Sequence, residues 1–136
     1  MSTGVTTLPR IVPQDSVKSV ILNYPFGETI SALRMVYIKN GLLYKGSPSL
    51  TLTEASVLGI LLNGGGVGSI GRVLAFGTLG DASFAGLSSN LPLFMQADGS
   101  IGNGDPSLQG FQYQVNIGKS FGSNLIYINV MEPIKL

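Results

Sequence analysis

Three residue types are missing from this chain of 136 residues: cysteine, histidine and tryptophan. Without cysteine there is no disulfide, no thiolate zinc site and no thiol nucleophile. Without histidine the chain lacks the commonest general base and the usual metal ligand, and a Ser-His-Asp triad is excluded. We therefore predict that the protein is not an enzyme, and we expect no catalytic, cofactor-binding or metal-binding residues.

Charge is also scarce. Charged residues make up 11% of the chain, and eight basic against seven acidic residues leave a net charge of +1. An average soluble domain has about 25% charged residues. Nucleic-acid binding requires clustered lysine and arginine, so we expect no direct DNA or RNA partner. A charge-poor, apolar surface is typical of a protein that is buried in a larger assembly.

Long hydrophobic runs are missing as well. Hydrophobic residues make up 44% of the chain, yet no apolar run approaches the roughly 18 residues of a membrane span. The start, Met1–Gly4, has neither the basic residues nor the apolar stretch of a signal peptide. We expect no membrane partner.

Glycine and proline, in contrast, are frequent. Nineteen glycines and seven prolines divide the sequence into short apolar pieces, which is typical of an all-β domain. The best helical candidate, Thr53–Leu62, is short and contains Gly59. The length suits one domain. We predict an all-β fold: a single β-sandwich, jelly-roll-like, or a β-barrel over residues 16–136, preceded by an extended, flexible N-terminal arm over residues 1–15.

Eight segments have the composition of strands. The dipeptide Asn40-Gly41 separates two of them and is the strongest hairpin signal, because both central residues of a type I′ turn need positive φ. In the last segment, odd-numbered and even-numbered residues alternate in character and are expected on opposite faces. The predicted strands are Val17–Asn23, Ile30–Ile38, Leu42–Tyr44, Val57–Leu62, Ile70–Phe76, Leu91–Gln96, Phe111–Ile117 and Asn124–Met131.

A weak internal repeat relates the two parts of the chain. Leu33–Gly41 aligns with Leu91–Gly99 at an offset of 58 residues, and each segment is an apolar strand that ends in Asn-Gly or Asp-Gly. Two copies are too few for a solenoid. They favour one β-domain built from two similar halves, although unrelated hairpins also look alike.

Two nucleotide-binding motifs are present in incomplete form. Gly66–Gly71 has the spacing G-x-G-x-x-G, but a strand pattern follows it where a dinucleotide site needs a helix. Gly118–Ser120 matches the end of a P-loop, but Tyr113 stands where the leading glycine belongs. We interpret both segments as loops and expect no nucleotide cofactor.

The seven acidic residues are spread singly along the chain. Asp98 lies in a turn dipeptide and Asp105 precedes a proline, so turn chemistry explains both. The segment Asp98–Asp105 lacks the bidentate glutamate of a calcium loop. Whether distant acids meet as a catalytic pair, as in a glycosidase, is left open by the sequence.

The order of several segments resembles a family of small virion domains from tailed bacteriophages. Glu28–Ile38 is similar to the opening GE-x-L-S-A-x-R-x-V-Y, and Val57–Ile60 to the step V-x-G-I/V-A. Arg72–Gly77 resembles the strand V-x-V-x-x-x-G, and Leu91–Gly99 resembles A/L-P-L-Y-L-G-x-D/N-G. The end, Ile128–Ile134, is similar to V-x-I-x-x-P-I-L-L. The resemblance covers residues 26–136.

Such domains occur in capsid decoration (cement) proteins, in head fibres and at the ends of tail fibres. The resemblance implies a structural virion protein, made in the host cytoplasm, that binds the outside of the capsid and stabilises the mature shell by bridging capsomers. Its partners would be the major capsid protein and further copies of itself, as a dimer or trimer. The alternative is a receptor- or glycan-binding fibre module, with exposed loops at Phe84–Asn90 and Gly118–Asn124.

Candidate contact residues come from the arm and from the loops. The arm contributes its apolar and proline residues, and the Gly/Pro-rich loop after the first strand contributes two aromatic rings, which can anchor in a partner. Core packing is the alternative role for these rings. The predicted capsid or partner contacts are Leu8, Pro9, Ile11, Val12, Tyr24 and Phe26.

Overall fold

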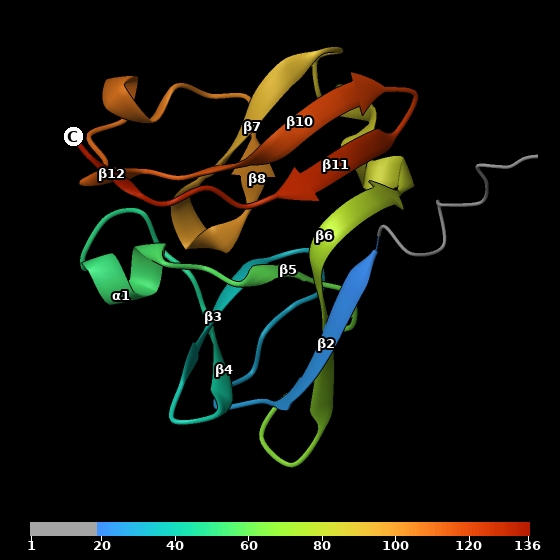
Figure 1. The fold of residues 1–136 in the computed structure, drawn as a ribbon, viewed down its shortest axis with the longest axis vertical. Coiled ribbons are helices and arrows are strands. Elements are labelled where there is room, and N and C mark those ends of the chain that lie inside the picture. Colours follow the sequence, from blue (N-terminus) through green and yellow to red (C-terminus); the bar gives the residue numbers. More distant parts are fainter. Residues whose placement is uncertain (1–18) are drawn as a thin grey trace, which may run out of the picture.

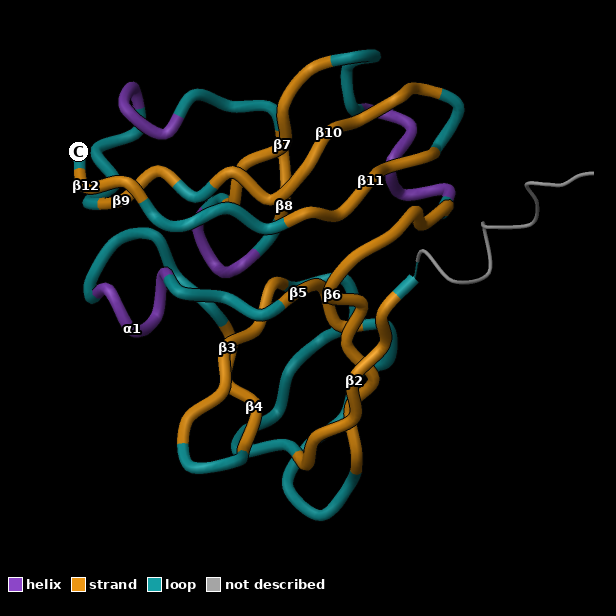
Figure 2. The backbone as a smooth tube through the Cα atoms, in the orientation of Figure 1, coloured by secondary structure: helices purple, strands orange, loops and turns teal. Residues whose placement is uncertain are grey.

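Strands account for most of the regular structure in the computed structural model, which describes residues 19–136 (Figures 1 and 2). The strands are β2 (Val20–Pro25), β3 (Met35–Lys39), β4 (Leu42–Lys45), β5 (Gly59–Leu61), β6 (Ile70–Gly80), β7 (Leu91–Met95), β8 (Ile101–Gly102), β9 (Tyr113–Gln114), β10 (Asn116–Gly122), β11 (Leu125–Asn129) and β12 (Ile134–Lys135). The helices are α1 (Leu52–Ala55) and three 3-10 turns, η2 (Ala82–Gly86), η3 (Ala97–Gly99) and η4 (Pro106–Leu108). The all-β prediction is confirmed.

Nine of these strands form one antiparallel sheet. Eight follow one another in the order β4-β3-β5-β6-β11-β10-β7-β8, and β2 is attached to β6. The sheet is coiled into a half-barrel, because adjacent strands twist in one sense and the twist accumulates over many strands. The remaining two strands, β9 and β12, pair with each other.

The long strand β6 joins the two parts of the sheet. Its first part, Ile70–Phe76, pairs with β2, and its last part, Phe76–Gly80, pairs with β11. In Figure 1, β6 runs from the lower part, which contains β2 to β5, into the upper part with β7, β8, β10 and β11. A strand of eleven residues is long enough to contribute hydrogen bonds to both parts.

The two parts have the same strand order when each is followed inward from its outer edge. From one edge the order is β4-β3-β5-β6, and from the other edge it is β8-β7-β10-β11. In each half the two outer strands form a hairpin whose second strand lies at the edge. The next two strands of the chain that belong to the sheet follow inward. The prediction of two similar halves is confirmed by this order.

Turn geometry repeats in the two halves. Asn40 and Gly41 have φ of 53° and 77°, and Asp98 and Gly99 have φ of 66° and 71°. Positive φ at both central residues is what a type I′ turn requires. The predicted hairpin at Asn40-Gly41 therefore forms between β3 and β4, and its counterpart forms between β7 and β8.

The apolar interior consists of two clusters, and the larger one contains residues of both halves. The larger core cluster contains Met35, Ala55, Val57, Ile60, Leu74, Phe84, Leu93, Met95, Val115, Ile117, Ile126 and Ile128. The smaller cluster, in the lower half, contains Phe26, Ile30, Val36, Leu43, Leu61 and Val73. Three adjacent strands place side chains in both clusters: Met35 and Val36 on β3, Ile60 and Leu61 on β5, and Leu74 and Val73 on β6.

Most predicted strands are present, with different ends. The predicted Phe111–Ile117 segment contains the short β9 and only the start of β10, which continues to Gly122. The helical candidate shortens to α1, four residues capped by the Thr51 side chain, which accepts a hydrogen bond from Glu54 N. The G-x-G-x-x-G segment forms the connection between β5 and β6, as expected, and its last two residues begin β6.

Candidate interaction surface

The predicted contact at Phe26 is wrong. Its side chain is 1% exposed and belongs to the smaller core cluster. The chain after β2 crosses to β4, where Phe26 forms a bridge with Leu43 and Gly27 N donates to Leu43 O. This crossing turns the aromatic ring inward, so it is not available to a partner. Tyr24 is half-buried and packs against the same cluster.

The other predicted contacts, Leu8, Pro9, Ile11 and Val12, lie outside the described residues, as does the predicted arm, residues 1–15. The loop predicted at Phe84–Asn90 is also different from expectation, because Phe84 in η2 is 4% exposed and part of the larger core. The loop predicted at Gly118–Asn124 lies mostly within β10.

Turn chemistry accounts for several of the acidic residues. Asp81 and Asp105 cap η2 and η4 by accepting hydrogen bonds from Ser83 N and Ser107 N. Asp98 accepts a hydrogen bond of 2.9 Å from Lys45 Nζ across the two halves. This hydrogen bond, together with the positive charge of Lys45, lowers the pKa of the Asp98 carboxyl. Hydrogen bonds from Ser83 likewise lower the pKa of Asp81.

Within residues 19–136, no group of three or more metal-ligating side chains comes together. No helix in that part of the chain is long and apolar enough to cross a membrane.

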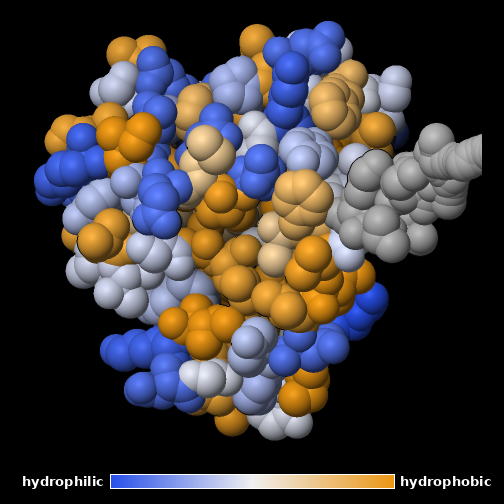
Figure 3. All heavy atoms as spheres, viewed as in Figure 1, coloured by the Kyte–Doolittle hydropathy of each residue, from blue (hydrophilic) through white to orange (hydrophobic). Residues whose placement is uncertain are grey.

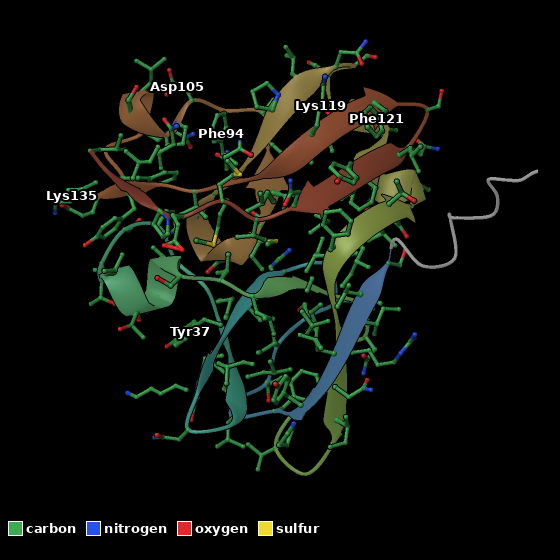
Figure 4. The ribbon with its side chains drawn as sticks, viewed as in Figure 1. Tyr37, Phe94, Asp105, Lys119, Phe121 and Lys135 are labelled. Carbon is green, nitrogen blue, oxygen red and sulfur yellow. The ribbon has the colours of Figure 1, made fainter. Side chains whose placement is uncertain are left out.

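The outer face of β6, β10 and β11 carries three aromatic rings, of which Tyr127 contacts the other two. The rings of Phe76 and Tyr127 lie edge to face, with centroids 5.5 Å apart, and the rings of Phe121 and Tyr127 are 6.3 Å apart. Phe121 is 39% exposed. The sequence predicted a loop at Phe121, because the stretch Gly-Lys-Ser-Phe-Gly lacks the usual composition of a strand. In the structure this stretch belongs to β10, and the ring of Phe121 lies on the surface (Figure 4).

A groove of about 440 Å³ adjoins these rings. Its lining combines apolar side chains with amides and two charges: Gln114, Asn116, Gly118, Lys119, Tyr127, Asn129, Met131, Glu132 and Ile134. Met131 and Ile134 are 55% and 57% exposed. A Cβ on Gly118 would overlap the carbonyl oxygen of Tyr127, so the close approach of β10 to β11 at this wall of the groove requires glycine.

A second groove, of about 350 Å³, lies at the boundary between the halves. It is lined by Ser56, Val57, Leu58, Ala75, Asn129, Val130, Met131, Glu132 and Pro133. Three residues, Asn129, Met131 and Glu132, line both grooves. The exposed Met131 side chain therefore stands as a ridge between two hollows.

Apolar side chains extend from these grooves along the same side of the molecule. Val20 and Ile21, at the start of β2, are 44% and 41% exposed. Figure 3 shows hydrophobic residues gathered in the middle of this face, over β5, β6 and β2. We call the two grooves, with the adjoining Val20, Ile21, Phe76, Phe121 and Leu125, the apolar face. Large exposed apolar patches mark protein–protein or membrane interaction sites or ligand-binding grooves.

Neither a protein-family model nor a curated protein sequence matches this chain.

Proposed function

We propose that this chain is a structural protein of a bacteriophage virion, which binds the outside of the capsid as a decoration protein and stabilises the mature shell. The observation that carries the proposal is the apolar face on a domain with few charges. A single domain that leaves such a face to water gains free energy by burying it, at about 25 cal/mol per Å² of apolar area. The resemblance of residues 26–136 to small phage virion domains supports the capsid as the partner.

The mechanism is stabilisation by mass action. A protein that binds the assembled, mature shell and not the dispersed subunits shifts the equilibrium toward the shell. Binding across the boundary between capsomers uses a surface that exists only in the lattice. No catalytic chemistry is part of this proposal.

Copy number in the particle tests the proposal. We expect quantitative mass spectrometry of purified phage particles to give a ratio to the major capsid protein near one, or a simple lattice fraction of it. Absence of the protein from the particle would overturn the proposal. A few copies per particle would also overturn it and would favour a fibre.

The fibre alternative has one observation in its favour. The groove beside Tyr127 places the amide side chains of Gln114, Asn116 and Asn129 near an aromatic ring. Aromatic rings and amides are suited to sugars, since one stacks on the apolar face of a sugar and the other bonds its hydroxyls. A receptor- or glycan-binding module of this type would be present in few copies.

We also propose that the predicted arm contributes to capsid binding through Leu8, Pro9, Ile11 and Val12. Deletion of residues 2–15 should weaken binding to purified shells while the circular dichroism spectrum of the domain stays unchanged. The matched variant, Leu8→Ser with Ile11→Ser and Val12→Ser, keeps the length and should weaken binding similarly. Full binding by both variants would exclude this role.

A further inference from the structure

The apolar face has a shape that complements itself. Met131 is 55% exposed and lines both grooves, so a ridge lies directly beside two hollows of about 440 and 350 Å³. A rotation of 180° about an axis that lies in the plane of such a face brings the same face of a second copy against it, and the ridge of one copy can then lie over a hollow of the other. Isologous contacts of this kind are the commonest in soluble homo-oligomers.

The charges on the apolar face are also self-complementary. Lys119, on β10, and Glu132, after β11, both line the larger groove. The ion pair found among residues 19–136 joins Lys45 and Asp98, so neither Lys119 nor Glu132 has an ionic partner within that part of the chain. One cation and one anion on a single face become two complementary pairs when a second copy faces it across a two-fold axis.

The number of residues on the face is close to that on one side of a standard interface. Fifteen residues line the two grooves, and five more apolar side chains adjoin them. A standard interface takes about 20–30 residues and about 800 Å² from each partner.

We propose that two copies of this chain associate through the apolar face about a two-fold axis. Met131 of each copy enters a groove of the other, and Lys119 of each copy lies beside Glu132 of the other. The aromatic group of Phe76, Phe121 and Tyr127 packs around this contact and excludes water from it. The dimer buries the same apolar face that the proposed function rests on, so a dimer of this kind leaves capsid binding to other surfaces, such as the predicted arm over residues 1–15. The mass of the protein in solution tests the dimer, and copy number in the particle tests the capsid role.

Charge reversal tests the pairing in the full chain. Sedimentation equilibrium and light scattering should give a mass of two copies for the natural protein at micromolar concentration. Lys119→Glu and Glu132→Lys, each alone, place like charges together and should raise the dimer dissociation constant at least tenfold. The double variant restores opposite charges and should bring the constant back to within a few-fold of the natural value.

Two further variants complete the design. Lys39→Glu, at the exposed end of β3 in the lower half, changes the net charge as Lys119→Glu does and should leave the dimer unchanged. Met131→Glu puts a charge on the ridge and should give a monomer with an unchanged circular dichroism spectrum. A monomeric natural protein, a mass of three copies, or a double variant no tighter than its parents would each overturn the proposal.

Discussion

At the scale of single residues, Gly59 in one half and Gly118 in the other both allow two paired strands to lie unusually close together. A Cβ on Gly59 would overlap the carbonyl oxygen of Leu74, and a Cβ on Gly118 would overlap that of Tyr127. In both places the glycine lets a strand pass close to its neighbour, β5 to β6 and β10 to β11. Gly118 also has φ of 148°, a backbone conformation that other residues rarely adopt.

Substitution of these glycines should therefore destabilise both halves. We expect Gly59→Ala to lower the free energy of unfolding by about 1–3 kcal/mol through overpacking. Gly118→Ala should cost about 3 kcal/mol or more, because backbone strain adds to the overlap. Gly86→Ala, where a Cβ meets nothing within 4 Å, should change stability by about 0.5 kcal/mol or less. Urea unfolding measures all three; equal costs would contradict the close approach.

A second residue-scale prediction concerns Asp98. Its hydrogen bond and ion pair with Lys45 lower the folded-state pKa below the ordinary value of 3.8. The pair therefore adds stability at pH values above 3.8, and that contribution is lost as the pH falls through the folded-state pKa. In Lys45→Met the pKa of Asp98 should rise toward its ordinary value in an NMR titration. An unchanged pKa in that variant would show that Lys45 is not the cause.

At the scale of elements, β11 shows how a strand positions the apolar face. Ile126 and Ile128 are fully buried, whereas Leu125 is 38% exposed and Tyr127 lies on the outer side with Phe121 and Phe76. Successive side chains of a strand point to opposite faces. One strand therefore supplies both the interior of the upper half and the wall of the larger groove.

The two faces of β11 should respond differently to truncation. Ile128→Ala removes buried methyl groups and should lower the free energy of unfolding by about 2–5 kcal/mol. Leu125→Ala, on the outer face of the same strand, should cost about 1 kcal/mol or less. Chemical denaturation of the two variants compares them directly. The comparison is made at protein concentrations below the dimer dissociation constant, so that a second copy does not bury Leu125. A cost at Leu125 as large as that at Ile128 would contradict the placement of the two side chains on opposite faces of β11.

At the scale of the whole molecule, the two halves are joined by β6. Its residues pair with β2 and β5 in the lower half and with β11 in the upper half. The larger core cluster contains residues of both halves, for example Ile60 and Ile126, and adjacent residues of β6, Val73 and Leu74, belong to different clusters. Loss of either cluster would therefore expose side chains of the sheet that also forms the other. The two similar halves thus form one folding unit.

Unfolding should accordingly be a single transition, as is usual for domains under 150 residues. Leu61→Ala in the smaller cluster and Ile117→Ala in the larger one should each shift the same transition to lower urea concentration. NMR signal intensities from residues of the two halves would follow it separately. Two midpoints, one for each half, would contradict the connecting role of β6.

Local features of the sequence determined much of this fold. These features are short-range signals, because turn geometry and strand alternation depend on adjacent residues. They are the spacing of glycine and proline, the runs of β-branched residues, and the Asn-Gly and Asp-Gly dipeptides. They were sufficient for the all-β class, the strand positions, the hairpins and the similarity of Leu33–Gly41 to Leu91–Gly99. The absence of cysteine and histidine limited the chemistry in the same direct way.

The tertiary structure alone decided which side chains remain exposed. Phe26 and Phe121 both lie in glycine-containing stretches, yet the first is in a core and the second is on the surface. The difference arises from long-range pairing. Phe26 forms a bridge with Leu43, 17 residues away in the sequence, and this pairing buries its ring. Phe121 lies within β10, where Ile117 and Ser120 occupy the inward-facing positions. The two grooves lined by Met131 likewise form between distant segments. The larger lies among β9, β10, β11 and the C-terminal segment, and the smaller lies among residues 56–58, β6 and residues 129–133. A contact surface of this kind is a property of distant segments brought together, and no local pattern encodes it.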